Sequence, residues 1–318
     1  MVSESQIEVE CYKPDKVVSD LFNFAQRSKE SVDRTAGPIL VIGGGGQRGA
    51  FGGGGVIALE KLGLRNAFKS LFVVSTGAPT GCYFLAGQAE VGTSIYYEEN
   101  AAKDSFIDFG KEKVMDIDRV VEVFQNSSKK IDLKKLNESK TEIYFGVTNS
   151  SSGKGLLLPL NNENNIFQLI KASCAVPELF NEEVSLFAKG VQSNYVDGSV
   201  AFPMPIAESF SIQKPSSVVV FANREKYKKE SVLEWLMEKY TAVIIKDSLK
   251  KKIEKGHSRF REEIRFLKKS HIRYLIFWTD GSINALTKNP YKLKLAANNF
   301  EKFVFEFIVK IKAKLDQK

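Results

Sequence analysis

The sequence has little histidine and little cysteine. Two histidines and three cysteines occur in 318 residues, and the cysteines, Cys11, Cys82 and Cys174, lie far apart. An odd number of scattered cysteines does not make a disulfide framework, and no group of Cys and His has the spacing of a zinc site. The sequence therefore predicts reduced thiols, and we expect neither a metal nor another cofactor.

Long hydrophobic runs are also missing. No apolar segment approaches the roughly 20 residues that span a bilayer. Residues 1–16 lack the basic start and the apolar centre of a standard secretory signal. We expect a cytoplasmic protein, with peripheral association to a membrane as a second option.

Negative charge is in the minority. Lysine and arginine total 46 against 38 aspartates and glutamates, which gives a formal net charge of +8. A basic surface favours an anionic partner, either nucleic acid or an anionic lipid surface. Because no nucleic-acid-binding motif accompanies the charge, we favour the lipid surface.

What the sequence does contain is a concentration of glycine in residues 39–55, ILVIGGGGQRGAFGGGG. The apolar run Ile39–Ile42 is typical of a strand that is covered on both faces. Gly43–Gly46 cannot continue that strand, but they let other atoms approach the main chain closely. Helical spacing follows from Val56, so the loop would present backbone N–H groups beside a helix N-terminus. Such a site favours negative charge, either a phosphate or an oxyanion that exists only during a reaction.

Strands and helices alternate along the rest of the chain. Apolar runs predict strands at 71–74, 143–147, 218–221 and 274–278, another strand that ends at 197, and a polar turn at 149–155. Helical spacing is seen at 17–26, 82–86, over most of 90–124, at 166–174 and at 300–315. This alternation indicates a layered α/β fold with a mainly parallel central sheet flanked by helices.

The composition becomes more basic from about Lys226. An apolar stripe continues to Leu267 and predicts a long helix or a helix pair, with a break expected at Gly256. The pattern is typical of a solvated helix face, and a docking surface for anionic lipid headgroups is the alternative. The charges concerned are Lys250–Lys252, Lys268, Lys269 and the interspersed Glu254, Glu262 and Glu263.

Ser75 is the leading candidate nucleophile. It follows the predicted strand 71–74 and precedes Gly77 and a helix, which is the context of a nucleophile elbow. The window VVSTG has Val73 where the full G-x-S-x-G motif has glycine. The alternative is that Ser75 only caps the next helix, and the window does not decide between the two.

Asp197 is the candidate base, because a serine hydroxyl needs a base to become a useful nucleophile. It precedes Gly198 at a strand end, where an aspartate commonly forms an Asx-turn. The order Ser75, Asp197, His271 matches that of an α/β-hydrolase triad. His257 and His271 nevertheless both lie in segments typical of a surface, which disfavours a histidine base.

The glycine loop has a second interpretation. Gly44, Gly46 and Gly49 fit the dinucleotide pattern G-x-G-x-x-G. That pattern requires an acidic residue at the end of the next strand, where this chain has Ser75. A Walker loop is excluded because no G-K-S/T follows. Arg48 would either neutralise a phosphate or brace the loop by bonding its carbonyls.

Three motifs, taken in order, resemble those of the patatin-like phospholipase family: GGGGQRG (43–49), VVSTG (73–77) and DGS (197–199). The segment KASCAVPELF (171–180) is similar to the family's A-S-x-x-x-P segment. AFPMPI (201–206) is similar to its asparagine-x-proline segment, although the asparagine is missing. The likeness covers about residues 38–210.

The resemblance implies a serine acyl hydrolase of the phospholipase A or lysophospholipase type, acting on phospholipids or other acyl esters. Ser75 would attack the ester carbonyl, and Asp197 would be its base without a histidine. The loop around Gly44, Gly45, Gly46 and Arg48 would hold the oxyanion through donors worth about 10²–10³-fold in rate each. Three parts follow: an N-terminal extension (1–36), a catalytic core (37–212), and a C-terminal strand with basic amphipathic helices packed on the core (213–318).

Two residues depart from the family pattern. Val73 occupies the first glycine position of the elbow, where a β-branched side chain would crowd the turn. Ser199 stands where the family usually has glycine or alanine. The change at Ser199 is the milder one. Because of Val73, the alternative function is a catalytically impaired lipid- or anion-binding protein of the same fold, and a nucleotide binder is the weaker third option.

Overall fold

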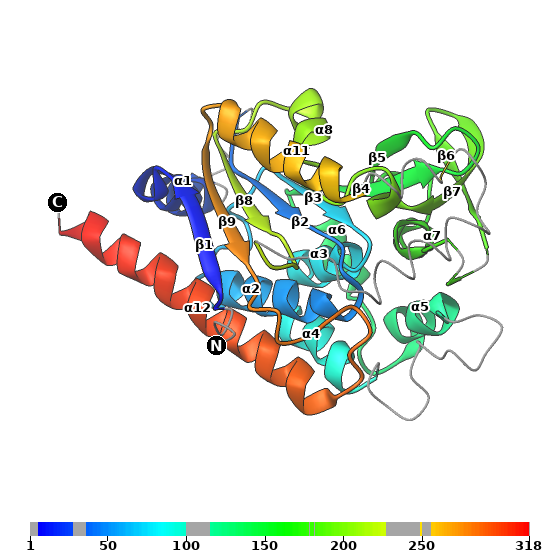
Figure 1. The fold of residues 1–318 in the computed structure, drawn as a ribbon, viewed down its shortest axis with the longest axis horizontal. Coiled ribbons are helices and arrows are strands. Elements are labelled where there is room, and N and C mark those ends of the chain that lie inside the picture. Colours follow the sequence, from blue (N-terminus) through cyan, green and yellow to red (C-terminus); the bar gives the residue numbers. More distant parts are fainter. Residues whose placement is uncertain are drawn as a thin grey trace.

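The computed structural model describes residues 6–27, 36–99, 115–177, 179–180, 182–226, 249 and 256–317. Within these residues the chain forms one sheet that lies between two layers of helices (Figure 1). The predicted α/β class is thus confirmed.

The sheet has nine strands in the described residues, in the order β1-β9-β8-β2-β3-β4-β7-β6, with β5 paired to β4. The five central strands from β9 to β4 run parallel, and the strands outside them pair antiparallel. The strand bounds are β1 Glu8–Tyr12, β2 Ile39–Ile42, β3 Ser70–Val74, β4 Glu142–Asn149, β5 Gly155–Pro159, β6 Val184–Ala188, β7 Val191–Asp197, β8 Ser217–Phe221 and β9 Arg273–Trp278.

Helices cover both faces of the sheet, with α8 and α11 on one side and α1, α2 and α12 on the other (Figure 1). Two short 3-10 turns, η1 (Gly46–Arg48) and η2 (Gly198–Val200), follow β2 and β7. The helix bounds are α1 Pro14–Arg27, α2 Gly49–Lys61, α3 Gly77–Leu85, α4 Ala89–Tyr97, α5 Ile117–Asn126, α6 Leu133–Asn137, α7 Ile166–Cys174, α8 Ile206–Ile212, α11 Gly256–Lys269 and α12 Pro290–Asp316.

The alternation of side chains along each central strand builds two cores. In β2, Ile39 and Val41 join the core beneath α8 and α11, while Leu40 and Ile42 join the core beneath α2 and α12. All four are fully buried, as expected for a strand of a parallel sheet with helices on both faces. The second core is the larger and holds the rings of Phe51, Phe221, Phe277 and Phe300.

Helix α2 approaches α12 closely because its middle consists of glycine. A Cβ atom at Gly54 would lie 2.1 Å from the carbonyl oxygen of Ala297 on α12. The second glycine cluster of the sequence, Gly52–Gly55, thus belongs to a helix interface and not to the loop. The expected C-terminal helix is present but begins ten residues earlier than predicted, at Pro290, and its Phe300 is fully buried.

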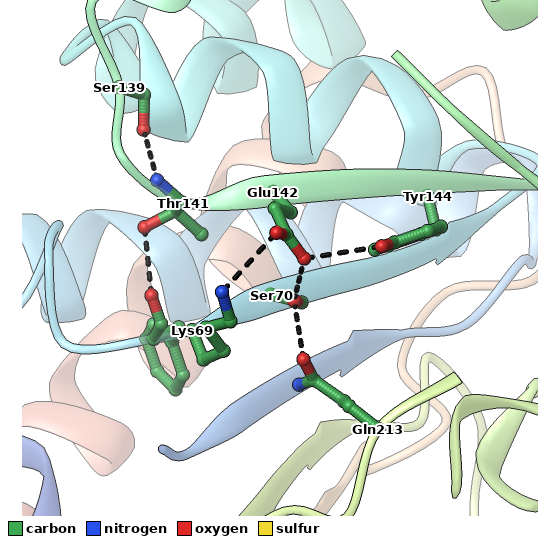
Figure 2. Close-up of polar contacts among 8 residues, drawn as sticks. Lys69, Ser70, Ser139, Thr141, Glu142, Tyr144 and Gln213 are labelled. Carbon is green, nitrogen blue, oxygen red and sulfur yellow. Dashed lines mark hydrogen bonds and ion pairs between the residues drawn. The ribbon is translucent and has the colours of Figure 1, made fainter. Parts of the chain in front are cut away.

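Polar side chains link neighbouring elements where β3 and β4 begin, at the opposite end of these strands from Ser75. The hydroxyl of Ser70 lies 3.1 Å from Glu142 Oε2 and 3.0 Å from Gln213 Oε1, which links β3, β4 and the end of α8 (Figure 2). Tyr144 and Lys69 also contact the Glu142 carboxylate (Figure 2). These contacts fix the relative positions of β3, β4 and the end of α8.

One part of the solvated-face prediction for the basic region is wrong. Glu263 on α11 is buried, and its carboxylate accepts a hydrogen bond from the N–H of Ala207 at 2.8 Å. Burial first, and then the charge of Glu208, raise the pKa of the Glu263 carboxyl well above its usual range. Glu263 therefore anchors α11 to the start of α8. Residues 227–248 and 250–255, with Lys250–Lys252 and Glu254, lie outside the described residues.

Several strand and helix predictions are confirmed within three residues, and three strands went unpredicted. Helices α1 and α7 and strands β2, β3, β8 and β9 match their predicted segments closely. Strands β1, β5 and β6 carried no recognised signal. The expected helical stretch 90–124 contains α4 and α5, and residues 100–114 between them lie outside the described part. No described helix is both long and apolar enough for a membrane span.

Candidate active site

Ser75 occupies the sharp turn between β3 and α3 in a left-handed backbone conformation with φ +52°. This conformation costs a non-glycine residue about 1–3 kcal/mol and must be held by its surroundings. The Ser75 N–H donates to the Ser173 hydroxyl at 3.0 Å, and that hydroxyl donates to the carbonyl of Gly146 at 2.8 Å. Ser173, which lies in the segment KASCAVPELF, thus supports the turn from α7.

The helix-cap alternative for Ser75 does not match the geometry. The N-cap of α3 is Thr76, and no side chain makes a capping hydrogen bond there. Gly77 is required at the first helical position because its Cβ would lie 2.4 Å from the carbonyl oxygen of Ile42. The short connection from β3 to α3 thus brings the helix N-terminus directly behind Ser75.

The glycine loop passes directly over Ser75. A Cβ at Gly44 would lie 2.9 Å from the Cβ of Ser75, so only glycine fits this approach. In the described part of the chain, no hydrogen bond uses the N–H groups of Gly44, Gly45 or Gly46. Arg48 braces the loop, since its Nε donates to the carbonyl of Gly45 at 3.3 Å.

Asn223 fixes the loop from the neighbouring strand. It follows β8 with φ +50°, and its side-chain amide donates to the carbonyl of Gly43 at 2.7 Å. The Gly43 N–H in turn donates to the carbonyl of Phe221 at 3.0 Å. The sequence analysis missed Asn223; an asparagine directly after a buried strand was the available signal, because asparagine tolerates this conformation.

Asp197 ends β7 and is fully buried. Its Oδ1 accepts hydrogen bonds from the N–H and the hydroxyl of Ser199, which includes the expected Asx-turn, whereas Oδ2 makes no ordinary hydrogen bond to a described residue. Burial raises the pKa of the carboxyl to about 6, although the two hydrogen bonds from Ser199 and the nearby Ser75 hydroxyl favour its charged form. A carboxyl group with this pKa is ionised at neutral pH and becomes protonated as the pH falls below 6.

Gly198 makes this turn possible. Its Cβ would lie 2.3 Å from the carbonyl oxygen of Gly146 on β4, so a side chain there would push β7 from β4. Thr148 of β4 bonds the carbonyl of Asp197 at 2.8 Å. Both Ser75 and Asp197 are thereby tied to β4.

Two pockets meet at Ser75. The first is the more polar of the two, is called the polar pocket below, and includes Gly44–Gly46, Arg48, Ser199 and Arg224 in its lining. Arg224, which the sequence analysis missed, lies over the ring of Phe260, with its guanidinium carbon 4.0 Å from the ring centroid. The second pocket is apolar and runs between α3, α4, α5 and α7; its lining includes Ile95, Tyr96, Met115, Ile117, Val120, Phe124 and Ile170.

Comparison with models of protein families identifies the family of this chain. The chain matches the family model described as patatin-like phospholipase over residues 40–209, more than half of its length. The chain belongs to the patatin-like phospholipase family.

Solved structures similar to this patatin-like chain have low sequence identity to it. VipD from Legionella pneumophila is 11% identical with a TM-score of 0.40, and the match covers 87% of this chain and 67% of VipD. Human GIVD cytosolic phospholipase A2 is 10% identical with a TM-score of 0.49, covering 99% of this chain and 67% of the human protein.

A third similar structure is the SpcU–ExoU complex of the Pseudomonas aeruginosa type III secretion system. It is 14% identical with a TM-score of 0.32, and the match covers 77% of this chain and 54% of the other. No curated protein matches the chain.

The histidine triad is not formed with His271 in this patatin-like chain. His271 precedes β9, whereas Ser75 follows β3, and the two strands run parallel in one sheet. Parallel strands begin at one edge and end at the other, so His271 and Ser75 lie at opposite edges. The side chain of His257 lies outside the described ones.

Val73, the departure from the patatin-like elbow, lies within β3 and is fully buried. Room for it comes from Gly81 on α3, where a Cβ would lie 2.8 Å from Val73 Cγ1. The missing side chain at Gly81, about one turn into the helix, thus leaves the room that Val73 occupies. The turn at Ser75 keeps its left-handed conformation with valine in place.

The close packing of Val73 against Gly81 predicts an energetic coupling between these two positions. We expect Gly81→Ala to destabilise the protein by about 1–3 kcal/mol through overpacking, and to be tolerated in a Val73→Ala background. Denaturant unfolding of the two single variants and the double variant would measure the coupling. If the changes in the free energy of unfolding of the two single variants add up to that of the double variant within about 0.5 kcal/mol, the coupling is contradicted.

Proposed function

We propose that this protein is a serine acyl hydrolase of the phospholipase A or lysophospholipase type that uses a Ser75–Asp197 dyad. The observation that carries the proposal is that three groups lie together: a strained serine, a buried carboxylate whose charged form the nearby Ser75 hydroxyl favours, and a glycine loop whose N–H groups make no hydrogen bond to a described residue. Membership of the patatin-like phospholipase family supports a lipid substrate.

In the proposed reaction, Ser75 Oγ attacks the ester carbonyl while its proton passes to Asp197. The N–H groups of Gly44–Gly46 stabilise the resulting oxyanion. Collapse of the intermediate breaks the ester C–O bond, and the leaving alcohol takes the proton from Asp197. Asp197 then removes a proton from water, which attacks the acyl-enzyme. The bond between Ser75 Oγ and the acyl carbon breaks, Asp197 returns the proton to Ser75 Oγ, and the fatty acid leaves.

The two pockets suit the two ends of a lipid ester. The apolar pocket between α3, α4, α5 and α7 would take the acyl chain, because its lining is almost entirely aliphatic and aromatic. The polar pocket would take the glycerol and headgroup side, where Arg48 and Arg224 favour a phosphate.

Removing either member of the dyad should abolish hydrolysis. We expect Ser75→Ala and Asp197→Asn to lower kcat/KM by at least about 10³-fold on a short-chain chromogenic ester and on mixed phospholipid vesicles. His271→Ala is the matched control and should keep wild-type activity. Wild-type kcat/KM should fall as the pH drops through about 6, since Asp197 is then protonated. Full activity of either dyad variant would refute the mechanism.

We further propose that the protein binds anionic membranes with the N-terminal end of α12 near the surface. The carbonyl of Ala285, in the loop before α12, accepts the N–H of Gln47 at 3.0 Å, so this end lies beside the glycine loop. Tyr291 and Leu295 are exposed there and flank the exposed Lys292 and Lys294 in the sequence. Aromatic and basic residues together suit a lipid interface.

Charge reversal at the two ends of α12 should have different effects on membrane binding. Each lysine near an anionic surface is worth about 1 kcal/mol, so we expect Lys292→Glu with Lys294→Glu to weaken binding to anionic liposomes at least tenfold. The pair Lys310→Glu and Lys314→Glu, at the far end of the same helix, is the control. Co-sedimentation at low and high salt measures both. Equal wild-type binding to neutral and anionic vesicles would remove the proposal.

A further inference from the structure

The two carboxylate oxygens of Asp197 have different surroundings. Oδ1 accepts two hydrogen bonds from Ser199, one from the N–H at 2.7 Å and one from the hydroxyl. Oδ2 is buried and makes no ordinary hydrogen bond to a described residue. Any residue at position 199 would supply the first bond through its backbone, but only a hydroxyl-bearing side chain supplies the second.

Ser199 also belongs to the wall of the reaction site. It lines the same polar pocket as Ser75 and Gly44. A Cβ at Gly44 would lie 3.7 Å from the Cβ of Ser199 and 2.9 Å from that of Ser75, so the three backbone segments are close together. Ser199 is the position at which the sequence departs from the glycine or alanine usual in the family.

We propose that Ser199 is a positioning residue of this enzyme: its hydroxyl holds Oδ1 and thereby fixes the carboxylate so that Oδ2 receives the proton of Ser75. This inference rests on the proposed dyad. Without the hydroxyl, the buried carboxylate keeps a single hydrogen bond from Ser199 and can rotate about its Cβ–Cγ bond. Rotation would present either oxygen to Ser75 and lower the fraction of productive encounters.

The Ser199 hydroxyl also stabilises the ionised form of the buried Asp197 carboxylate. Burial raises the pKa of Asp197, and among the effects that lower it the Ser199 hydroxyl is the largest, followed by the Ser199 N–H and the Ser75 hydroxyl. Loss of the hydroxyl therefore raises the pKa of the carboxyl further, because the ionised form loses a charge-assisted hydrogen bond.

The other titratable and charged groups around Asp197 do not replace this contact. Cys174 on α7 is close enough to respond to the charge of Asp197, and burial together with that charge raises the pKa of its thiol well above the ordinary value. It therefore stays neutral in the range where Asp197 titrates. Arg48 and Arg224 line the polar pocket, and neither is among the groups that affect the pKa of Asp197.

The test compares Ser199→Ala, Ser199→Gly and Ser199→Thr with the wild type. Removing the hydroxyl should move the acid limb of the pH profile of kcat/KM upward by about one pH unit. At pH 8 it should lower kcat about tenfold with little change in KM. Ser199→Thr keeps the hydroxyl and should restore the wild-type limb. Ser211→Ala is the control, since that hydroxyl bonds only the carbonyl of Glu208 on the exposed side of α8.

A second measurement does not depend on activity. The carboxyl carbon of Asp197 can be followed by NMR in protein labelled with ¹³C-aspartate, assigned with Asp197→Asn, and its pKa should rise by about one unit in Ser199→Ala and Ser199→Gly. An unchanged pKa and acid limb, with only a lower melting temperature, would overturn the inference. A shifted pKa in a protein without hydrolase activity would instead support the Ser199 contact and refute the proposed function.

Discussion

The close approach of Gly44 to Ser75 is the contact on which the rest of the site depends. Strands β2 and β3 are parallel neighbours, so the loop after one and the turn after the other leave the sheet at the same edge. The two main chains come so close that a single methyl group at position 44 would reach the Cβ of Ser75. This closeness puts backbone N–H groups within reach of any atom that bonds to the serine hydroxyl.

Holding that contact requires support from several directions. The strained backbone of Ser75 is tied to Ser173 and through it to β4, while Asn223 holds the glycine loop from β8. Asp197 is tied to β4 as well, by the hydroxyl of Thr148 and by the glycine that follows it. Because β4 holds both members of the proposed dyad, it fixes the serine and the aspartate relative to each other although they are far apart in the sequence.

Much of the fold could be predicted because the central strands have simple signals. Ile39–Ile42 and Ser217–Phe221 are short, apolar and β-branched, as strands covered on both faces must be. The strands at the margins gave no such signal. In β1 and β6, exposed polar residues such as Glu8 and Ser185 interrupt the pattern, and only pairing with β9 or β7 makes them strands.

Candidate site residues could be named from the sequence where a local motif marks them, as with Ser75, Gly77 and Asp197, and their catalytic roles stay predictions. Residues whose contacts depend on a distant partner could not be named in this way. Asn223, Arg224 and Ser173 contact residues that are distant in the sequence, and the local sequence does not identify those partners, although an asparagine directly after a buried strand was a signal for Asn223. The departure at Val73 likewise could not be weighed before Gly81 was seen to face it. Glu263 resembled its solvated neighbours because burial depends on the tertiary packing of α11 on α8.

The most direct test of the central claim is covalent labelling of the folded protein with a fluorophosphonate, read by intact mass and peptide mapping. An activated serine beside an oxyanion site should displace fluoride and retain one phosphonyl group. The account predicts one adduct per chain, located on Ser75 and absent in Ser75→Ala. A folded protein that takes up no label, or one labelled on Ser199 instead, would contradict it.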